Sequence, residues 1–381
     1  MFIELTEEQS ILRDTLRKLG KDKLERLTIE SDRADRFDHE SLQLLKEIGI
    51  FGLPAPTKYG GAETNVTTLT IVLEELGYFS PSMGCTLIGH LALVRPLFLG
   101  GNRFLEERYF TKMANQELGA FCLTEPEAGS DAASIKTKAE EKDGDNWLIN
   151  GTKRFITSGG IADFYGVWTV TGPGKGSNGI SLFYLDKEAE GISVGKIEEK
   201  MGIRGSQTAE MIFEDVRVSK EYMCGSKGKG LKLAFEGLDL VRCGLGGLAV
   251  GLAQASLDKA IQYMKERHQF GQPIAQFQAL QFMVANLAMN IEAARALTYQ
   301  TSSLYDSGYK GKDLITKTSM TKCFATDTCM RVTTDVVQIF GGYGYMKDYP
   351  VERMMRDAKI LQIIEGTSQI HHHIIGRNLL V

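Results

Sequence analysis

The sequence has few of the features that mark specialised classes of protein. Its six cysteines are scattered along 381 residues without a C-x-x-C pair, which is typical of free thiols in a reducing compartment and not of a disulfide scaffold. The formal net charge is −4 and no block of Lys or Arg is present, so nothing indicates a nucleic-acid partner. No uninterrupted apolar run reaches transmembrane length, and the first residues lack a secretory pattern. We therefore expect a cytoplasmic protein with no membrane span and no nucleic-acid partner.

The composition is that of a globular chain with room for several domains. Hydrophobic residues make up 43% and charged residues 24% of the sequence, as in ordinary soluble proteins, and the length suffices for about two or three domains. Residues 6–9, Thr-Glu-Glu-Gln, fit a helix capping box, and apolar residues at helical spacing follow them. Residues 67–77 and 83–99 predict further helices, so we expect the first third to be helical.

The character of the sequence changes near Gly119. The pair Asn150-Gly151 stands between two apolar runs, which predicts a hairpin turn. Residues 180–185 and 211–218 read as strands. The middle third is therefore predicted to be a compact β domain.

The last third returns to helical patterns. Small residues recur three or four positions apart between residues 244 and 255, which gives one helix face a smooth surface for close packing. Residues 280–305 and 318–340 predict two more long helices. The chain is thus predicted to be an α+β protein with an N-terminal α-helical domain (1–118), a middle β domain (119–228) and a C-terminal α-helical domain (229–381).

One carboxylate near the C-terminus is the leading candidate for catalysis. Glu365 stands between two isoleucines and Gly366, so we expect its side chain to lose contact with water. Desolvation raises the pKa of a carboxyl group towards the range useful to a general base, and a glycine lets the backbone approach a bound group. Taken alone, a solvated glutamate at a helix start would be the commoner explanation, so the redox interpretation depends on the other segments.

Two further segments could hold a cofactor. Residues 121–131 run from apolar residues into a Pro/Gly/Ser turn, where backbone N–H groups and the hydroxyls of Thr124 and Ser130 could hold a polar ring edge or a phosphate. Residues 153–160 place the aromatic ring of Phe155 two residues from the hydroxyl of Thr157. Without context, the first of these segments would be interpreted as a simple loop.

Together these segments resemble the acyl-CoA dehydrogenases, a family of FAD-dependent enzymes. The resemblance covers nearly the whole chain, in order, and looks strongest to the short-chain, butyryl-type members. Its motifs are Thr-Glu-Pro-x-Ala-Gly-Ser-Asp (124–131), Ile-Asn-Gly-x-Lys (149–153), Phe-Ile-Thr (155–157), Lys-Met-Gly-Ile-Arg-Gly-Ser-x-Thr (200–208), Phe-Glu-Asp-Val (213–216), Arg-His-Gln-Phe-Gly (267–271), Gln-Ile-Phe-Gly-Gly (338–342) and Glu-Gly-Thr (365–367). The family fold implies a β-barrel-like middle domain and a C-terminal four-helix bundle.

The resemblance implies a reaction, a cofactor and partners. Glu365 matches the family's catalytic base, which removes the α-proton of an acyl thioester while the β-hydrogen leaves as hydride to flavin N5. The thioester carbonyl is held by the backbone N–H of Glu365 and a ribityl hydroxyl, which acidifies the α-carbon. The implied cofactor is FAD. The implied partners are an acyl-CoA substrate, electron-transfer flavoprotein and further copies of the chain in a homotetramer, a dimer of dimers.

The resemblance also assigns contacts residue by residue. Positions that match FAD contacts made within the chain are Phe121, Leu123, Thr124, Gly129, Ser130, Phe155, Thr157, Thr367 and Gln369. Positions that match FAD contacts made by a neighbouring subunit are Arg267, Phe270, Gln278, Gln338 and Gly342. Positions assigned to the substrate are Ser130, Asp239, Arg242, Cys85, Ile364 and Gly366. A salt bridge at a helix end would also explain Arg242.

The chain departs from the family pattern at several positions. Ile364 stands where many members have Tyr, and Cys85 falls near a position where Thr or Ser often lines the pocket. For Cys85 and for His90, a position in the pocket lining and a position in the protein core are equally expected. The arginine with which glutaryl-specific members hold a distal carboxylate has no obvious counterpart. We therefore predict oxidation of a short or medium acyl-CoA, including branched or cyclic ones, to the 2,3-enoyl-CoA.

Several other interpretations were weighed against this one. A dehydrogenase of an acyl or aminoacyl group on a carrier protein, an oxidase that passes electrons to oxygen, and a non-catalytic helical scaffold would all keep the fold. The tract His371-His372-His373 suggests a metal site. It aligns with the family's last helix, on which consecutive side chains point in different directions, so we expect no metal site.

Overall fold

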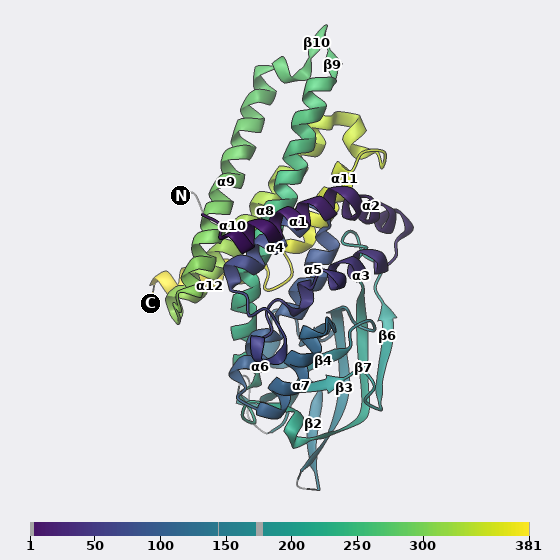
Figure 1. The fold of residues 1–381 in the computed structure, drawn as a ribbon, viewed down its shortest axis with the longest axis vertical. Coiled ribbons are helices and arrows are strands. Elements are labelled where there is room, and N and C mark those ends of the chain that lie inside the picture. The colour runs from purple at the N-terminus through teal and green to yellow at the C-terminus, as the bar shows by residue number, and fades with distance from the viewer. Residues whose placement is uncertain (1–3, 144, 173–177, 381) are drawn as a thin grey trace.

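The computed structural model describes residues 4–143, 145–172 and 178–380, and it divides along the chain into helical, β and helical regions (Figure 1). The first region contains α1 (Glu7–Leu19), a π-helical turn (Gly20–Leu24), α2 (Glu25–Ala34), α3 (His39–Glu47), α4 (Val66–Phe79), α5 (Pro81–Leu91), α6 (Val94–Leu99) and α7 (Arg103–Ala114). The second contains β1 (Gly119–Cys122), β2 (Lys138–Lys142), β3 (Asn146–Thr157), β4 (Phe164–Val170), β5 (Ile180–Asp186), β6 (Ile192–Ile197), β7 (Thr208–Ser219) and β8 (Met223–Cys224). The third contains α8 (Gly230–Glu266), β9 (His268–Gln269), β10 (Gln272–Pro273), α9 (Gln278–Asp306), α10 (Lys312–Phe340), α11 (Val351–Leu361) and α12 (Ser368–Leu380). This order confirms the predicted fold class.

The N-terminal helices begin where their sequence signals lie, with one exception. Thr6 and Gln9 form the predicted capping box, because each side chain accepts a hydrogen bond from the other's backbone N–H. The single helix predicted over 83–99 is wrong, because the chain forms α5 and α6 with a break at Ala92 and Leu93. Pro96 has no N–H to donate and is accommodated in the first turn of a helix, so a second helix begins at Val94.

The middle region forms an eight-stranded sheet. Its hydrogen-bonded order is β6-β7-β3-β2-β4-β5-β8, and β1 pairs in parallel with β4. Strands β4 and β5 are buried along almost their whole length, as expected of strands covered on both faces. Trp168 on β4 donates its indole N–H to the carbonyl of Gly230 at 2.8 Å, which ties the sheet to the first turn of α8.

The turn predicted at Asn150-Gly151 is also wrong. Strand β3 continues through both residues, with a register shift between Ile149 and Gly151 that marks a β-bulge. Gly151 has a φ of 151°, and a Cβ there would lie 2.6 Å from Oγ1 of Thr137. The Asn150 side chain instead exchanges hydrogen bonds with Asp215 on β7. The Asn-Gly pair therefore bends a continuous strand and does not reverse it.

Helix α8 runs through the centre of the protein and meets the N-terminal region along its glycine face. A Cβ at Gly247 would lie 2.6 Å from the carbonyl oxygen of Thr70, and one at Gly251 would lie 1.9 Å from that of Glu74. The small residues predicted to give a smooth face thus let α4 and α8 approach closely. Two segments, Pro81–Leu99 and Gly230–Glu266, are apolar and long enough to cross a membrane, but 78% and 94% of their apolar windows are buried inside the protein. They are core helices of this fold.

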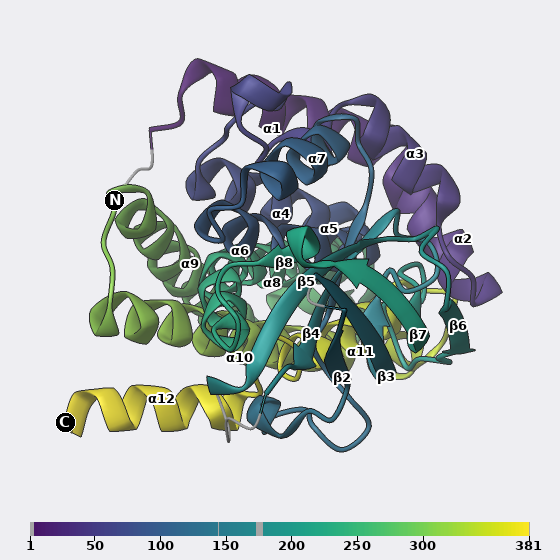
Figure 2. The same cartoon turned by 90° about the horizontal axis from the view of Figure 1, so that it is seen from below.

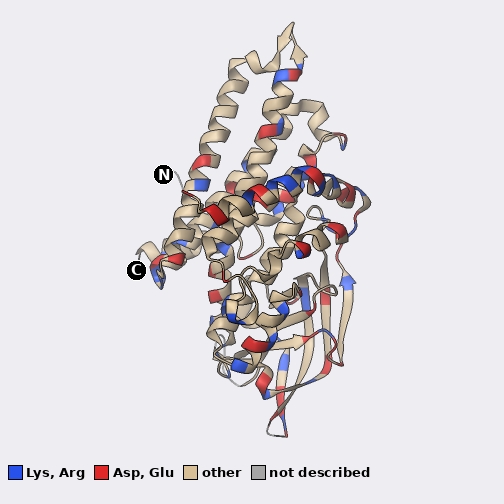
Figure 3. Cartoon of the chain, in the orientation of Figure 1, with Lys and Arg blue, Asp and Glu red and all other residues tan. Residues whose placement is uncertain are grey.

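The long helices α8, α9 and α10 extend away from the sheet, and the β9–β10 hairpin lies at their far end (Figure 1). Seen from below, α12 runs beside α10 and projects away from the strands (Figure 2). The far half of α9 carries almost no charge (Figure 3). Several apolar side chains there are exposed in the single chain, among them Phe282 and Met289. Contiguous exposed apolar surface of this kind marks an interaction face.

Candidate active site

The loop between α11 and α12 holds Glu365 in a strained conformation. Glu365 has a φ of 57° and Gly366 a φ of 94°, both in the left-handed region that a non-glycine residue rarely occupies. A Cβ at Gly366 would lie 3.0 Å from Nε2 of His371, so this glycine is required by both its backbone angle and its neighbour. A strained non-glycine residue is retained when surrounding contacts fix it, and this loop has such contacts.

Three cationic or imidazole side chains hold the backbone of this loop. Nε2 of His371 donates to the carbonyl of Glu365 at 3.1 Å, and Nε of Arg242 donates to the same carbonyl at 3.4 Å. Nζ of Lys322 donates to the carbonyl of Gly366 at 2.6 Å. These contacts fix the two peptide units that follow the Glu365 Cα. Among the described residues, the Glu365 carboxylate itself forms no hydrogen bond and no ion pair.

Burial and neighbouring charges shift the pKa values of the titratable groups in and around this loop. Desolvation raises the pKa of Glu365 above its ordinary 4.5, while Arg242 and Lys322 oppose that rise. Burial lowers the pKa of His371 to about 3, so its ring is neutral. Because its Nε2 donates to a carbonyl, Nδ1 carries no proton, and Nδ1 is a buried atom without a partner in the described residues. Burial also lowers the pKa of Lys322, to about 8.

The segment after β6 packs against α11, the helix that precedes this loop. Burial is the main cause that raises the pKa of the Cys85 thiol on α5, and the carboxylates of Asp357 and Glu365 act in the same direction. Asp357 accepts a hydrogen bond from the N–H of Ile203 at 2.5 Å, which docks the 200–208 motif onto α11. His90 has a different role: its ring contacts the carbonyl of Phe51 and accepts from the N–H of Gly119. His90 is therefore a core residue that ties α5 to β1.

The predicted flavin-edge residues are brought together by β1, β3 and the loop after β1. The N–H of Arg154 donates to the carbonyl of Thr124 at 2.8 Å. A second register shift in β3 lies between Lys153 and Ile156, and at that bulge Phe155 has a φ of 57° with 58% of its surface exposed. A Cβ on Gly89 of α5 would lie 3.3 Å from the Thr157 side chain. An exposed aromatic ring beside a hydroxyl and backbone amides fits a flat heteroaromatic ring.

A buried ion pair holds this loop in place. Nζ of Lys153, whose side chain is 0% exposed, donates to Oε1 of Glu125 at 2.8 Å and to the carbonyl of Leu123 at 3.1 Å. Glu125 also accepts hydrogen bonds from the backbone N–H groups of Lys136 and Thr137. Burial and these partners act in opposite directions, and the pKa of Glu125 ends below its ordinary value. The pair fixes the backbone of Leu123 and Thr124, which both lie in the predicted cofactor site.

A second group of predicted residues lies far from Glu365, at the tip of the helical region. Arg267, Phe270, Gln338 and Gly342 line a hollow of about 650 Å³ around the β9–β10 hairpin, and Gln278 is the first residue of α9 there. Phe270 has a φ of 52° and is 93% exposed. The guanidinium of Arg267 lies 5.2 Å from the Tyr343 ring centre. We call this group, with its hollow, the bundle tip.

The bundle tip and the Glu365 loop cannot contact one cofactor within a single chain. Arg242 and Arg267 lie on and at the end of the same helix α8, and a helix rises about 1.5 Å per residue, so 25 positions separate them by roughly 37 Å. Figure 1 shows the hairpin at the end of the molecule opposite the sheet. If both groups contact the same ligand, the Glu365 loop must therefore come from one copy of the chain and the bundle tip from another.

The remaining predicted residues divide between pocket and surroundings. Asp239 accepts from Nη1 of Arg242 at 2.7 Å, and Arg242 is 5% exposed, so this pair stands behind the loop. Ile364 is half-buried against the core, and Phe121 packs at 4.1 Å from the ring centre of Trp168. Thr367 and Gln369 begin α12, and Gly129 and Ser130 lie exposed in the loop after β1. Sequence reasoning missed Lys322, His371 and the Glu125–Lys153 pair.

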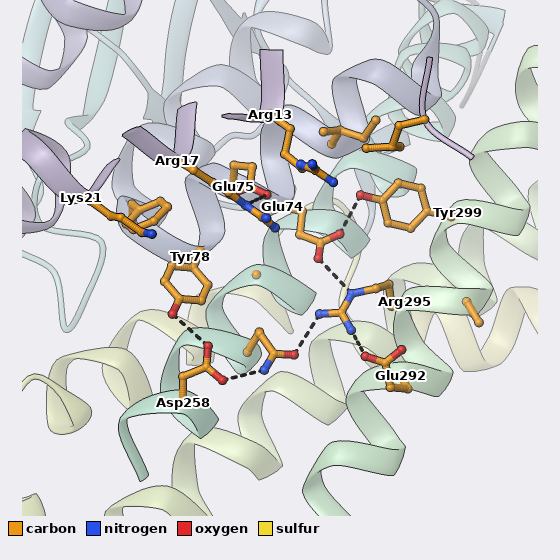
Figure 4. A pocket seen from close by; sticks show the side chains of 16 residues that line it. Arg13, Arg17, Lys21, Glu74, Glu75, Tyr78, Asp258, Glu292, Arg295 and Tyr299 are labelled. Carbon is orange, nitrogen blue, oxygen red and sulfur yellow. Dashed lines mark hydrogen bonds and ion pairs between the residues drawn. The ribbon is translucent and has the colours of Figure 1, made fainter. Parts of the chain in front are cut away.

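A hollow of about 920 Å³ between α1, α4, α8 and α9 is not part of this site (Figure 4). Several of its charged side chains pair with one another, as Arg17 with Glu75 and Arg295 with Glu74, each at 2.9 Å. None of the predicted site residues lines it. Its paired charges brace the N-terminal helices against α8 and α9.

Comparison with known proteins identifies this arrangement as that of a flavoprotein oxidoreductase acting on a CH–CH bond. The acyl-CoA dehydrogenase N-terminal domain model matches residues 6–117, the middle domain model matches 120–216, and the C-terminal domain model matches 228–380. The chain belongs to the acyl-CoA dehydrogenase family.

Individual relatives match over nearly their whole length. Cyclohexane-1-carbonyl-CoA dehydrogenase of Geobacter metallireducens is 41% identical, and the match covers 98% of each chain. The structure of butyryl-CoA dehydrogenase from Megasphaera elsdenii has a TM-score of 0.96 at 40% identity, covering 100% of both chains. A chain from a structural study of the electron transferring flavoprotein of Acidaminococcus fermentans has a TM-score of 0.95 at 43% identity, also covering 100% of both chains.

Proposed function

We propose that this acyl-CoA dehydrogenase uses Glu365 as the base that removes the α-proton of a short or medium acyl-CoA, giving the 2,3-enoyl-CoA. The observation that carries the proposal is the Glu365 loop: a carboxylate without a partner among the described residues, on a backbone held from behind by His371, Arg242 and Lys322. Desolvation raises its pKa, so it is a stronger proton acceptor than a solvated carboxylate once ionised.

The surrounding residues position this base. Hydrogen bonds to the carbonyls of Glu365 and Gly366 fix the two peptide planes that follow the Glu365 Cα, and this restricts the backbone that carries the Glu365 N–H. A fixed N–H can donate to a thioester carbonyl and stabilise the negative charge that develops as the α-proton leaves. Arg242 and Asp239, predicted as CoA-side contacts, support this role through the Glu365 carbonyl; direct CoA contact stays a prediction.

The cofactor that fits the site is FAD, which when bound accepts the β-hydrogen as hydride. Leu123 and Thr124 are held by the buried Glu125–Lys153 pair and by Arg154, so their backbone is fixed for the edge of a flat ring. Phe155 offers an exposed aromatic face at a β-bulge. Ser158, next to Thr157, has a buried hydroxyl without a partner in the described part of the chain. The residues present therefore suit a flavin.

We infer that each cofactor is shared between two chains in a homotetramer. The bundle tip is rich in predicted FAD contacts but lies roughly 37 Å along α8 from Arg242, and its hollow is open. The exposed apolar side chains of α9 and the tip, including Phe270, Phe282 and Met289, need a covering partner, and a second copy would supply one. Electron-transfer flavoprotein is the proposed acceptor, since a chain 43% identical comes from a study of such a protein.

The substrate preference is proposed from the pocket wall and the relatives. Ile364 precedes Glu365 and is a partly buried aliphatic residue, and Cys85, predicted as a pocket residue, is a small buried one, so both suit an uncharged acyl group. Relatives act on butyryl-CoA and on cyclohexane-1-carbonyl-CoA. One methylene in such a pocket changes discrimination by about 1–3 kcal/mol, so butyryl and cyclohexanoyl groups should be separated by measurable ratios of kcat/KM.

The experiment that tests this function is anaerobic flavin reduction. The purified holoenzyme is mixed with butyryl-CoA, hexanoyl-CoA, cyclohexanoyl-CoA and glutaryl-CoA, and the loss of oxidised-flavin absorbance is followed. We expect rapid bleaching by at least one uncharged acyl-CoA and little by glutaryl-CoA. A yellow protein that no acyl-CoA bleaches would contradict the proposal and favour a thioester on a carrier protein. Rapid peroxide formation in air would favour an oxidase, and failure to bind FAD would favour a scaffold.

A further inference from the structure

A cluster of three potential metal ligands lies where α10 meets α12, behind the Glu365 loop. Cys323 and Asp327 stand four residues apart on α10, and His372 faces them from α12. Sγ of Cys323 lies 3.3 Å from Nε2 of His372 and 3.6 Å from Oδ2 of Asp327, and all three ligand atoms lie within 4.8 Å of one another. The residues come from two helices that are distant in sequence, so the cluster is a product of the fold.

Two of the three ligand spacings match the edges of a tetrahedral zinc site. Zinc binds cysteine sulfur at about 2.3 Å and histidine nitrogen or carboxylate oxygen at about 2.0–2.2 Å. Two such ligands at a tetrahedral angle lie about 3.5 Å apart. The two distances from Cys323, 3.3 and 3.6 Å, fall on either side of that value. The third, between His372 and Asp327, is at most 4.8 Å, so these two side chains must approach each other by up to about 1.4 Å when a metal ion enters.

The carboxylate of the cluster is already oriented by neighbours. Oδ1 of Asp327 accepts from Nε2 of Gln362 at 2.6 Å and from Oγ of Ser368 at 3.0 Å, which leaves Oδ2 facing the sulfur. Outer hydrogen bonds of this kind fix the ligands of metal sites. Gln362 and Ser368 flank the Glu365 loop, so a metal held by Asp327 is linked to both ends of that loop.

The surroundings of the cluster also suit a metal with one open position. Cys323 is 4% exposed, Asp327 is half-buried and His372 is exposed, so an ion can enter from the His372 side and keep one solvent ligand. Lys322, the nearest cation in sequence, donates to the carbonyl of Gly366 and is turned away from the sulfur. The three consecutive histidines separate: His371 donates to the carbonyl of Glu365, and only His372 contacts the thiol.

We infer that Cys323, Asp327 and His372 form a binding site for a zinc-class divalent transition metal, with a solvent molecule as the fourth ligand. Sulfur, nitrogen and one carboxylate oxygen favour zinc or cobalt over magnesium or calcium, which prefer oxygen ligands alone. Binding replaces the thiol proton by the metal, so one proton per ion passes to the buffer. The inference departs from the expectation of no metal site, because His372 meets potential ligands on another helix, which the histidine tract alone cannot reveal.

The test is zinc and cobalt binding by untagged, FAD-loaded enzyme after treatment with a chelator. We expect one zinc ion per chain with a Kd in the micromolar range or below, measured by competition with a chromogenic chelator. Cobalt should give d–d absorption bands of a tetrahedral site at longer wavelength than oxidised flavin absorbs. Zinc should also raise the melting temperature, since a ligand that binds the folded state stabilises it.

Matched variants distinguish this cluster from other metal-binding groups. His372→Gln should weaken zinc binding by at least tenfold and abolish the tetrahedral cobalt spectrum, whereas His373→Gln, its exposed neighbour, should change neither. Cys323→Ser should act like His372→Gln; if that buried substitution impairs folding, the exposed His372 and His373 pair still decides the question. Equal zinc affinity in wild type and His372→Gln would overturn the inference. Absence of stoichiometric binding at micromolar zinc would also overturn it and leave a thiol–imidazole hydrogen bond.

Discussion

The Glu365 loop and the bundle tip are both assigned to one active site, but they are built in opposite ways. The loop is partly buried, and its strained residue Glu365 and the following Gly366 are held by His371, Arg242 and Lys322 from the same chain. The bundle tip is open, and its strained residue Phe270 is 93% exposed. The loop therefore has its supporting contacts within one chain, while in the proposed assembly a second chain covers the tip.

This difference separates two kinds of function. A base needs a fixed geometry before the substrate arrives, and the contacts of the loop within one chain provide it. Cofactor contacts supplied across an interface make assembly and cofactor binding depend on each other. Substitutions in the loop should therefore change turnover at constant flavin content, and substitutions in the tip should change flavin content and assembly together.

The largest expected effect is at Glu365. Glu365→Gln removes the proton acceptor but keeps the shape of the side chain, so we expect turnover to fall by about 10²–10⁴-fold while the protein stays yellow and binds acyl-CoA. Glu365→Asp, which keeps the charge but shortens the side chain, should retain more activity than Glu365→Gln. The measurement is the anaerobic rate of flavin reduction in each variant. Near-normal reduction by Glu365→Gln would assign the base to another residue.

The next effect concerns the buried pair behind the flavin edge. Lys153→Met leaves the Glu125 carboxylate buried without its partner, and breaking a buried ion pair costs about 3–5 kcal/mol. Urea denaturation should show this loss in the free energy of unfolding, and Lys153→Met with Glu125→Gln should recover part of it. The control is Lys136→Met, because Lys136 and Glu127 form an exposed pair, and no measurable change is expected there. Equal free energies of unfolding for Lys153→Met and wild type would show that the Lys153–Glu125 pair does not stabilise the protein.

A smaller effect on activity per flavin is expected at the bundle tip. Arg267→Ala removes a cation that lies over Tyr343 at the open hollow, so flavin content and flavin affinity should fall by about tenfold, the equivalent of 1.4 kcal/mol. Turnover per bound flavin should stay near that of wild type. Flavin content is read from the absorbance ratio after gel filtration, which also reports assembly. Unchanged flavin affinity with reduced turnover would contradict the division between loop and tip.

The smallest effect is a pH dependence of stability. Because the pKa of Glu365 is raised above 4.5 by desolvation, the folded state holds its proton more tightly than the unfolded chain does. This tighter proton binding adds to the free energy of unfolding. The contribution is fully present below pH 4.5 and is lost as the pH rises through the folded-state pKa of Glu365. Glu365→Gln, which is neutral throughout, should match wild type in acid and exceed its free energy of unfolding at neutral pH. A constant difference across this range would show that the pKa is not raised.

The sequence predicted the order of elements better than their local geometry. The capping box at Thr6, the smooth glycine face of α8 and the long helices α9 and α10 all follow from local spacing, and the structure confirms them. The Asn150-Gly151 turn and the single helix over 83–99 were wrong. At Gly151 a tertiary contact, the approach of Thr137, decided the outcome, whereas at Pro96 a local effect that the sequence displays, the preference of proline for the first turn of a helix, was overlooked.

The sequence predicted the residues assigned to catalysis and cofactor binding, but it did not predict the residues that hold them in place. Glu365 and the Thr124 and Phe155 segments carry short motifs that the sequence displays directly. Lys322, His371 and Lys153 act through backbone carbonyls of residues far away in the chain or on another element, and no local spacing encodes such contacts.

The most direct test of the account is complementation between a chain without the base and a chain with a damaged bundle tip. Glu365→Gln is co-expressed with a chain carrying Arg267→Ala and Phe270→Ala, and mixed assemblies are isolated through two different tags. One site in each mixed pair then combines a native Glu365 from one chain with a native bundle tip from the other. The account predicts that, at limiting flavin, flavin reduction by acyl-CoA per chain exceeds that of both parents. Mixed assemblies no more active per chain than the parents would contradict an active site shared between chains.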